Sequence, residues 1–146
     1  MNFFKGYSIK KGIQLSRGEF IIIQYADLEY DSEEYNLLLI PMLYNEADVV
    51  YGSRFKGNQL HRILFFWHSI GNKFLTFLSN LLNNSNFTDM ETCYKLFKSI
   101  IKNIKIKENR FGFETEITAK ISKIKNIKIY EVGISYHGRT YNEEKK

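Results

Sequence analysis

Short apolar runs alternate along this chain with longer stretches in which apolar residues recur every three or four positions. The short runs are typical of buried strands, and the longer stretches are typical of helices. Strands are therefore predicted at residues 19–24, 47–51, 93–97 and 127–136. Helices are predicted at residues 6–16, from Ser32 through residues 37–39, at 60–82 and at 113–125, and Pro41 should kink or end the second helix early. This order predicts an α/β fold, with a mostly parallel sheet flanked by helices.

The predicted helix at residues 60–82 is the longest in the chain, and its apolar face is wide. Burial in the core is the favoured explanation of such a face. A second explanation is a helix that lies in a membrane interface, with aromatic rings such as that of Trp67 at headgroup depth. Cations such as Lys73 would then lie beside the lipid phosphates.

The first predicted strand runs directly into an acidic segment. In extended backbone, residues two apart point to the same side, so Asp27, Glu29 and Asp31 can present oxygen atoms together. Carboxylates at the carboxyl end of a buried strand suit Mg²⁺ or Mn²⁺, which prefer oxygen ligands and often share them with phosphates. The competing interpretation is an acidic turn in which Asp31 or Ser32 caps the next helix.

Composition restricts the class of protein more than its function. A chain of 146 residues with 44% hydrophobic residues is expected to fold as a single domain, residues 1–146. The formal charge of +5 is compatible with anionic substrates, a membrane surface or nucleic acid, and selects none of them. Cys93 is the only cysteine, which excludes an intrachain disulfide and fits a reducing compartment. The absence of an apolar run of ~18 residues or a signal-peptide core predicts a cytoplasmic protein without a transmembrane helix.

A series of motifs follows in an order that resembles a known family. They occupy residues 27–31, 47–55, 67–76, 88–95, 109–114 and 136–141. Together they resemble the family 2 inverting glycosyltransferases, in particular the polyprenyl- or dolichyl-phosphate mannose and glucose synthases, over residues 11–146. The resemblance implies a GT-A fold, a Mg²⁺ or Mn²⁺ cofactor and a nucleotide sugar of the GDP-mannose or UDP-glucose type. It also implies a polyprenyl or dolichyl phosphate acceptor on the cytoplasmic face of a membrane, where the protein would bind peripherally.

The resemblance also implies roles for particular residues. Asp27 and Glu29 correspond to the metal-binding end of the acidic motif, and Asp27 is counted with the catalytic residues. Asp89 and Glu91 correspond to catalytic acidic residues near the transferred sugar. The cations implied to bind phosphate are Arg54, then Arg139 and Lys145 for the acceptor, with Arg62 a weaker candidate for the same role.

Three departures from the family pattern bear on activity. Tyr25 stands where the family has an aspartate, and a phenol that is neutral near pH 7 is a poor ligand for Mg²⁺. The chain is expected to lack the first βαβ unit of the fold, which holds the nucleotide. Glu144 stands where the family usually has a glycine, beside the basic pair.

Three hypotheses follow. The first is a glycosyltransferase domain fragment that retains metal-dependent chemistry. The second is a catalytically inactive remnant, or a half-protein that needs a separate N-terminal segment. The third is a basic binding module for anionic membrane or nucleic acid, ranked last because the lysines show no regular interleaving with aromatic residues, so that no nucleic-acid partner is expected.

Overall fold

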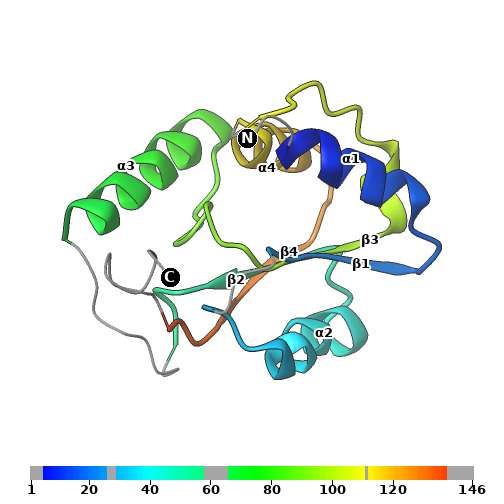
Figure 1. Cartoon of the computed structure of the whole chain (residues 1–146), viewed down its shortest axis with the longest axis horizontal. Helices are drawn as coiled ribbons and strands as arrows, with labels where there is room; N and C mark the ends of the chain where they lie inside the picture. The colour runs from blue at the N-terminus through cyan, green and yellow to red at the C-terminus, as the bar shows by residue number, and fades with distance from the viewer. Residues whose placement is uncertain (1–4, 26–28, 58–65, 111, 138–146) are drawn as a thin grey trace, which may run out of the picture.

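A four-stranded sheet lies between two layers of helices (Figure 1). The computed structural model describes residues 5–25, 29–57, 66–110 and 112–137. The helices are α1 (Lys5–Leu15), α2 (Tyr35–Tyr44), α3 (Phe66–Asn83) and α4 (Phe113–Ile121), with short 3₁₀ helices η1 (Ser32–Glu34) and η2 (Ser99–Asn103). The strands are β1 (Phe20–Ile23), β2 (Val49–Ser53), β3 (Lys95–Lys98) and β4 (Ile129–Gly133). Helices α1, α3 and α4 lie on one side of the sheet and α2 lies on the other.

The expectation of a mostly parallel sheet is wrong for the pairing of neighbouring strands. The strand order is β1-β3-β2-β4, and β3 is antiparallel to both β1 and β2, while β2 and β4 pair in parallel. Lys95, the first residue of β3, lies opposite Ile23 and Tyr51 near the carboxyl ends of their strands. The chain therefore enters β3 at the end where β1 and β2 finish, so β3 must run the other way. The α/β class itself is confirmed.

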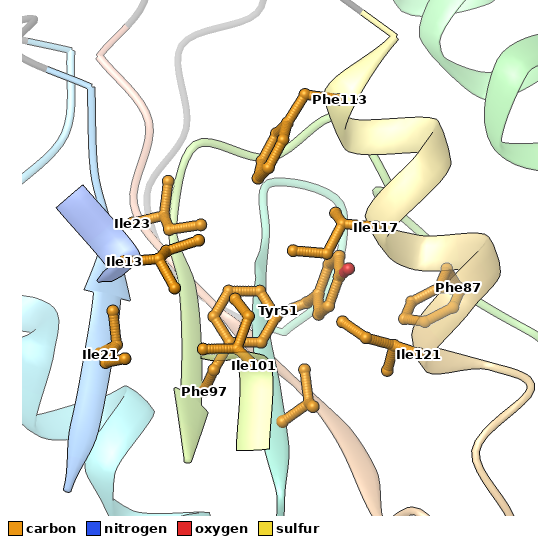
Figure 2. Close-up of a cluster of buried hydrophobic side chains, with 11 residues drawn as sticks. Ile13, Ile21, Ile23, Tyr51, Phe87, Phe97, Ile101, Phe113, Ile117 and Ile121 are labelled. Atoms are coloured by element: carbon orange, nitrogen blue, oxygen red, sulfur yellow. The ribbon is translucent and has the colours of Figure 1, made fainter. Parts of the chain in front are cut away.

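The main hydrophobic core fills the space between the sheet and the layer of α1 and α4 (Figure 2). Tyr51 points from β2 toward α4, where Ile117 and Ile121 face the sheet. Its hydroxyl forms a buried hydrogen bond of 2.9 Å with the hydroxyl of Thr118. Successive side chains of a strand point to opposite faces of the sheet. Those that point toward the layer of α1 and α4 are apolar because this layer covers them.

A second cluster covers the opposite face of the sheet and includes Leu38 and Met42 of α2. The prediction that Pro41 ends this helix early is wrong, because α2 continues to Tyr44 with Pro41 inside it. Proline removes one backbone donor from the helix interior. Here Pro41 is itself buried between Leu38 and Met42, so packing of this face holds the last turn in place.

The apolar side of helix α3 is exposed, although its sequence pattern favoured a helix buried in the core. Its buried residues are the small polar Thr76 and Ser79, whereas its large apolar side chains are exposed. The exposed side chains are Phe66, Trp67, Ile70, Phe74, Leu75, Phe77, Leu78, Leu81 and Leu82. The prediction of a core helix is therefore wrong for residues 66–83, and residues 60–65 lie outside the described part.

Candidate functional site

A buried ion pair joins the loop after β2 to the segment that leads into β3. The Arg54 guanidinium donates from Nε to Oδ2 of Asp89 and from Nη2 to Oδ1, each at 2.7 Å. The backbone N–H of Arg54 donates to Oδ2 as well, at 3.1 Å. The Asp89 side chain is 0% exposed and the Arg54 side chain 13% exposed. Such a bidentate pair fixes both groups in direction as well as position.

The surroundings keep Arg54 ionised despite its burial. Burial by itself lowers the pKa of the Arg54 guanidinium, but the hydrogen bonds and the negative charge of Asp89 outweigh burial, so the pKa is raised overall. Arg54 therefore remains a cation beside Asp89.

Glu131 of β4 holds the loop that carries Asp89. Its carboxylate accepts from the backbone N–H of Thr88 at 2.8 Å and from that of Asp89 at 3.3 Å. The Thr88 hydroxyl donates to the same carboxylate at 3.1 Å and lies 2.6 Å from the hydroxyl of Ser53. The loop is therefore tied to both β2 and β4, which places Asp89 beside Arg54.

Glu29, from the acidic turn after β1, is linked to Arg54 through Tyr136. Its carboxylate accepts a hydrogen bond of 3.1 Å from the Tyr136 hydroxyl, and its carbonyl accepts one of 3.0 Å from the backbone N–H of His137. The Arg54 guanidinium carbon lies 5.4 Å from the centre of the Tyr136 ring, within range of a cation–π contact. Burial, and then the charge of Glu29, raise the pKa of Tyr136 to about 12. The structure therefore brings Glu29, Arg54 and Asp89 together around Tyr136.

Tyr25 is directed to a different buried group. Its hydroxyl donates to Oε1 of Glu114, at the start of α4, and the Lys5 ammonium contacts the same oxygen at 2.7 Å. Lys5 also lies 3.8 Å from the centre of the Tyr25 ring. Since the Glu114 side chain is 1% exposed, the opposite charge of Lys5 and the hydrogen bond from Tyr25 together offset the cost of burying its carboxylate.

Lys95 is a buried cation at the entrance to β3. It is 1% exposed, its ammonium donates to the Thr92 carbonyl, and it lies 5.3 Å from the centre of the Tyr51 ring. Burial lowers the pKa of Lys95 to about 8, against the opposing charges of Asp89 and Glu91. Glu91 is half-buried in the same segment, and its negative charge acts to raise the pKa of Lys95.

The structure describes some of the expected site residues and not others. Arg54, Asp89 and Glu29 lie in one assembly, and Glu91 follows Asp89 in the same loop. Asp31 behaves as the alternative interpretation predicted, because its carboxylate caps η1 by accepting from the Glu33 N–H at 2.9 Å. The remaining candidates lie outside the described residues: Asp27, Arg62, Arg139 and Lys145.

Sequence reasoning missed several groups that complete the site: Lys95, Glu114, Glu131 and Tyr136. Lys95 gave one signal, since it is a cation at the start of β3, directly before the apolar residues Leu96 and Phe97. Glu114 and Tyr136 fall within the motif ranges and Glu131 does not, but none of the three signalled its partner, because the partners lie far away along the chain. Within the described part of the chain, no group of three histidine, cysteine or acidic side chains is arranged to hold a metal ion.

Comparisons with known proteins agree with this architecture. Residues 1–104, well over half of the chain, match the glycosyl transferase family 2. The chain is 27% identical over 136 residues to the low-salt glycan biosynthesis hexosyltransferase Agl6 of Haloferax volcanii, covering 92% of this chain and 33% of that protein. It therefore spans about one third of this curated relative.

The fold is similar to that of glucosyl-3-phosphoglycerate synthase from Mycobacterium tuberculosis. A crystal structure of that enzyme with phosphoglyceric acid has a TM-score of 0.66 at 14% identity, covering 97% of this chain and 50% of that one. The complex with Mn²⁺, uridine diphosphate and phosphoglyceric acid has a TM-score of 0.65 at 11% identity, with 97% and 49% covered. This likeness confirms the predicted GT-A fold. By its match over residues 1–104, the chain belongs to glycosyl transferase family 2.

Proposed function

We propose that this chain is part of a glycosyltransferase that moves a hexose from a nucleotide sugar to a polyprenyl or dolichyl phosphate, with inversion. The observation that carries the proposal is the buried Arg54–Asp89 pair, linked to Glu29 through Tyr136 beyond the carboxyl ends of β1 and β2. Ligands of open α/β sheets bind outside these ends. Family membership and the hexosyltransferase relative support the reaction class.

Arg54 is the phosphate-binding group of this proposal. The two hydrogen bonds to Asp89 use two of the five N–H donors of a guanidinium, which leaves donors for a phosphate oxygen. Asp89 and the ring of Tyr136 hold the planar group in one orientation, so little conformational freedom is lost when a phosphate binds. An acceptor phosphate is itself nucleophilic, and the contribution of the site is then positioning and charge stabilisation.

Asp89 and Glu91 are proposed to lie near the transferred sugar. For the acceptor phosphate we propose Arg139 and Lys145, with Arg62 as a third candidate, and each can be tested by substitution. Such an acceptor resides in a membrane, so the proposal includes peripheral binding at its cytoplasmic face. The helices of the described segments include none long and apolar enough to cross a bilayer.

The proposal includes dependence on Mg²⁺ or Mn²⁺, with Asp27 and Glu29 as ligands. A bound divalent cation would neutralise the diphosphate leaving group. The described residues contribute one carboxylate, that of Glu29, while Tyr25 points toward Glu114. These residues alone do not make a metal site.

A second candidate function follows from Tyr25. Its phenol occupies the family's aspartate position and is bound to Glu114 beside Lys5, which favours a non-catalytic protein that retains phosphate binding. A variant of the second candidate is a half-protein completed by a separately encoded segment. Both candidates predict nucleotide binding at Arg54, but only the first predicts transfer.

The test measures binding of UDP-glucose and GDP-mannose by calorimetry, with Mn²⁺ or with EDTA, and transfer of labelled sugar to a short polyprenyl phosphate. We expect Arg54→Ala, measured under conditions where circular dichroism shows it to be folded, to weaken binding at least about tenfold, because a charged hydrogen bond to the phosphate is lost. The matched control is Lys125→Ala, an exposed cation after α4. Equal binding by both variants would overturn the assignment of Arg54, and binding without transfer would favour the non-catalytic candidate.

A further inference from the structure

Helix α3 presents its apolar side to the outside of the molecule. Trp67 is 76% exposed and Leu81 69% exposed, although both side chains are large and apolar. In Figure 1, α3 lies at the edge of the helical layer, beside α4. Scattered apolar residues on a surface are ordinary, but a continuous apolar helix face marks an interaction surface.

The inner side of α3 is polar, and hydrogen bonds hold it in place. The Thr76 hydroxyl accepts from the Met90 N–H at 3.2 Å. The side chain of Asn80 donates to the Phe87 carbonyl at 2.8 Å and accepts from the Phe87 N–H at 2.9 Å. These bonds fix the rotation of the helix about its axis, so the apolar side cannot turn inward without breaking them.

The chemistry of the exposed side favours a lipid surface over a protein partner. The 18 residues of α3 include no aspartate or glutamate, and Lys73 is their cation. Aromatic side chains of the kind found at membrane interfaces, Phe66 and Trp67, begin the helix. The chain carries a formal charge of +5, which is complementary to anionic headgroups.

We propose that α3 lies in the plane of an anionic bilayer, with its apolar side among the outer parts of the lipid chains. The helix of 18 residues has one exposed apolar side and one polar side, as an interfacial helix does. Lys73 lies 5.4 Å from the centre of the Phe55 ring, which is also exposed, so the apolar surface continues onto the loop after β2. The proposal goes beyond sugar transfer, because it rests on α3 and holds whether or not the chain transfers a sugar.

Trp67 is the only tryptophan of the chain and serves as the probe. We expect its fluorescence to shift to shorter wavelength, and the protein to sediment with vesicles, when vesicles containing phosphatidylglycerol are added without nucleotide or acceptor. Binding should fall with added salt and be weaker on vesicles of phosphatidylcholine alone.

The variant Phe74→Glu/Leu81→Glu tests the surface directly. Both side chains are exposed, so the fold should be kept, while two apolar anchors are replaced by charges that anionic lipid repels. We expect vesicle affinity to fall by about a hundredfold or more, since each anchor lost costs about tenfold. The matched control is Leu15→Glu in α1, where the wild-type side chain is 77% exposed on another part of the surface.

Three results would overturn the proposal. The first is failure of the wild-type protein to bind anionic vesicles, and the second is equal binding by the double variant and the control. The third is a dimer in light scattering whose Trp67 emission is already at short wavelength in buffer, because a second copy would then cover α3. Since no sugar donor is present, none of these results depends on transferase activity.

Discussion

Removing Arg54 should destabilise the protein strongly, because its partner Asp89 cannot reach solvent. The carboxylate is 0% exposed in the intact pair, and in Arg54→Ala it keeps the backbone N–H at 3.1 Å but loses two charged hydrogen bonds of 2.7 Å. Breaking a buried pair in this way costs about 3–5 kcal/mol. A domain has a total stability of about 5–15 kcal/mol, so the loss is a large fraction of it.

Asp89→Asn should cost less than Arg54→Ala. The amide has nearly the same volume, and the guanidinium that remains is 13% exposed and can be partly hydrated. We expect a loss of about 1.5–3 kcal/mol, the range for a hydrogen bond to a charged group. The double variant should lose less than the sum, with a coupling of about 1–3 kcal/mol between the two positions.

Equilibrium unfolding in urea, followed by circular dichroism, measures these free energies. The control is Lys98→Ala, which removes an ion pair of 3.1 Å with Asp48 whose two side chains are 33% and 28% exposed, and should cost at most about 1 kcal/mol. If Arg54→Ala costs no more than Lys98→Ala, or if the two single changes are additive, the reasoning from burial is refuted.

Three further changes test other parts of the fold by the same unfolding assay. Although burial raises the pKa of Glu116, its hydrogen bonds lower it to about 2, so the stabilisation is present above an unfolded pKa of about 4.3 and lost toward pH 2. Glu116→Gln should therefore be destabilised at pH 7, and a difference from wild type that persists at pH 2 would contradict this. Tyr51→Phe should cost about 1–2 kcal/mol, because a buried threonine hydroxyl loses its partner, and an unchanged free energy of unfolding would contradict that contact. Gly133→Ala would place Cβ 2.0 Å from a backbone oxygen of the loop after β2 and should lower the free energy of unfolding by about 2 kcal/mol or more. Its control, Gly12→Ala, lies in open space within α1 and should be neutral or stabilising. Equal effects of the two substitutions would contradict the predicted clash.

Much of this fold could be predicted from the chain alone. Periodicity predicted α1 and β1 to within a residue at either end, and the order of motifs identified the family before any geometry was known. The cap formed by Asp31 was also predicted as one of two interpretations of the acidic turn. These features are local, since spacing and turn chemistry within a few residues determine them.

The candidate site depended on contacts between distant residues. Glu131 holds the Asp89 loop across more than forty positions, and Tyr25 binds Glu114 across almost ninety. Such pairs leave no periodic signal in one sequence, because each partner alone resembles an ordinary surface residue. Pairing with Arg54 is what distinguishes Asp89 from a turn carboxylate.

The sequence by itself determined where strands and helices form and which family they belong to. Only the tertiary structure decided the direction of β3, the orientation of Tyr25 and the side of α3 that faces outward. A hydrophobic pattern shows that a helix has two different sides, but burial depends on what the rest of the chain packs against it. In α3, the hydrogen bonds of Thr76 and Asn80 to the segment before β3 turn the polar side inward and leave the apolar side exposed.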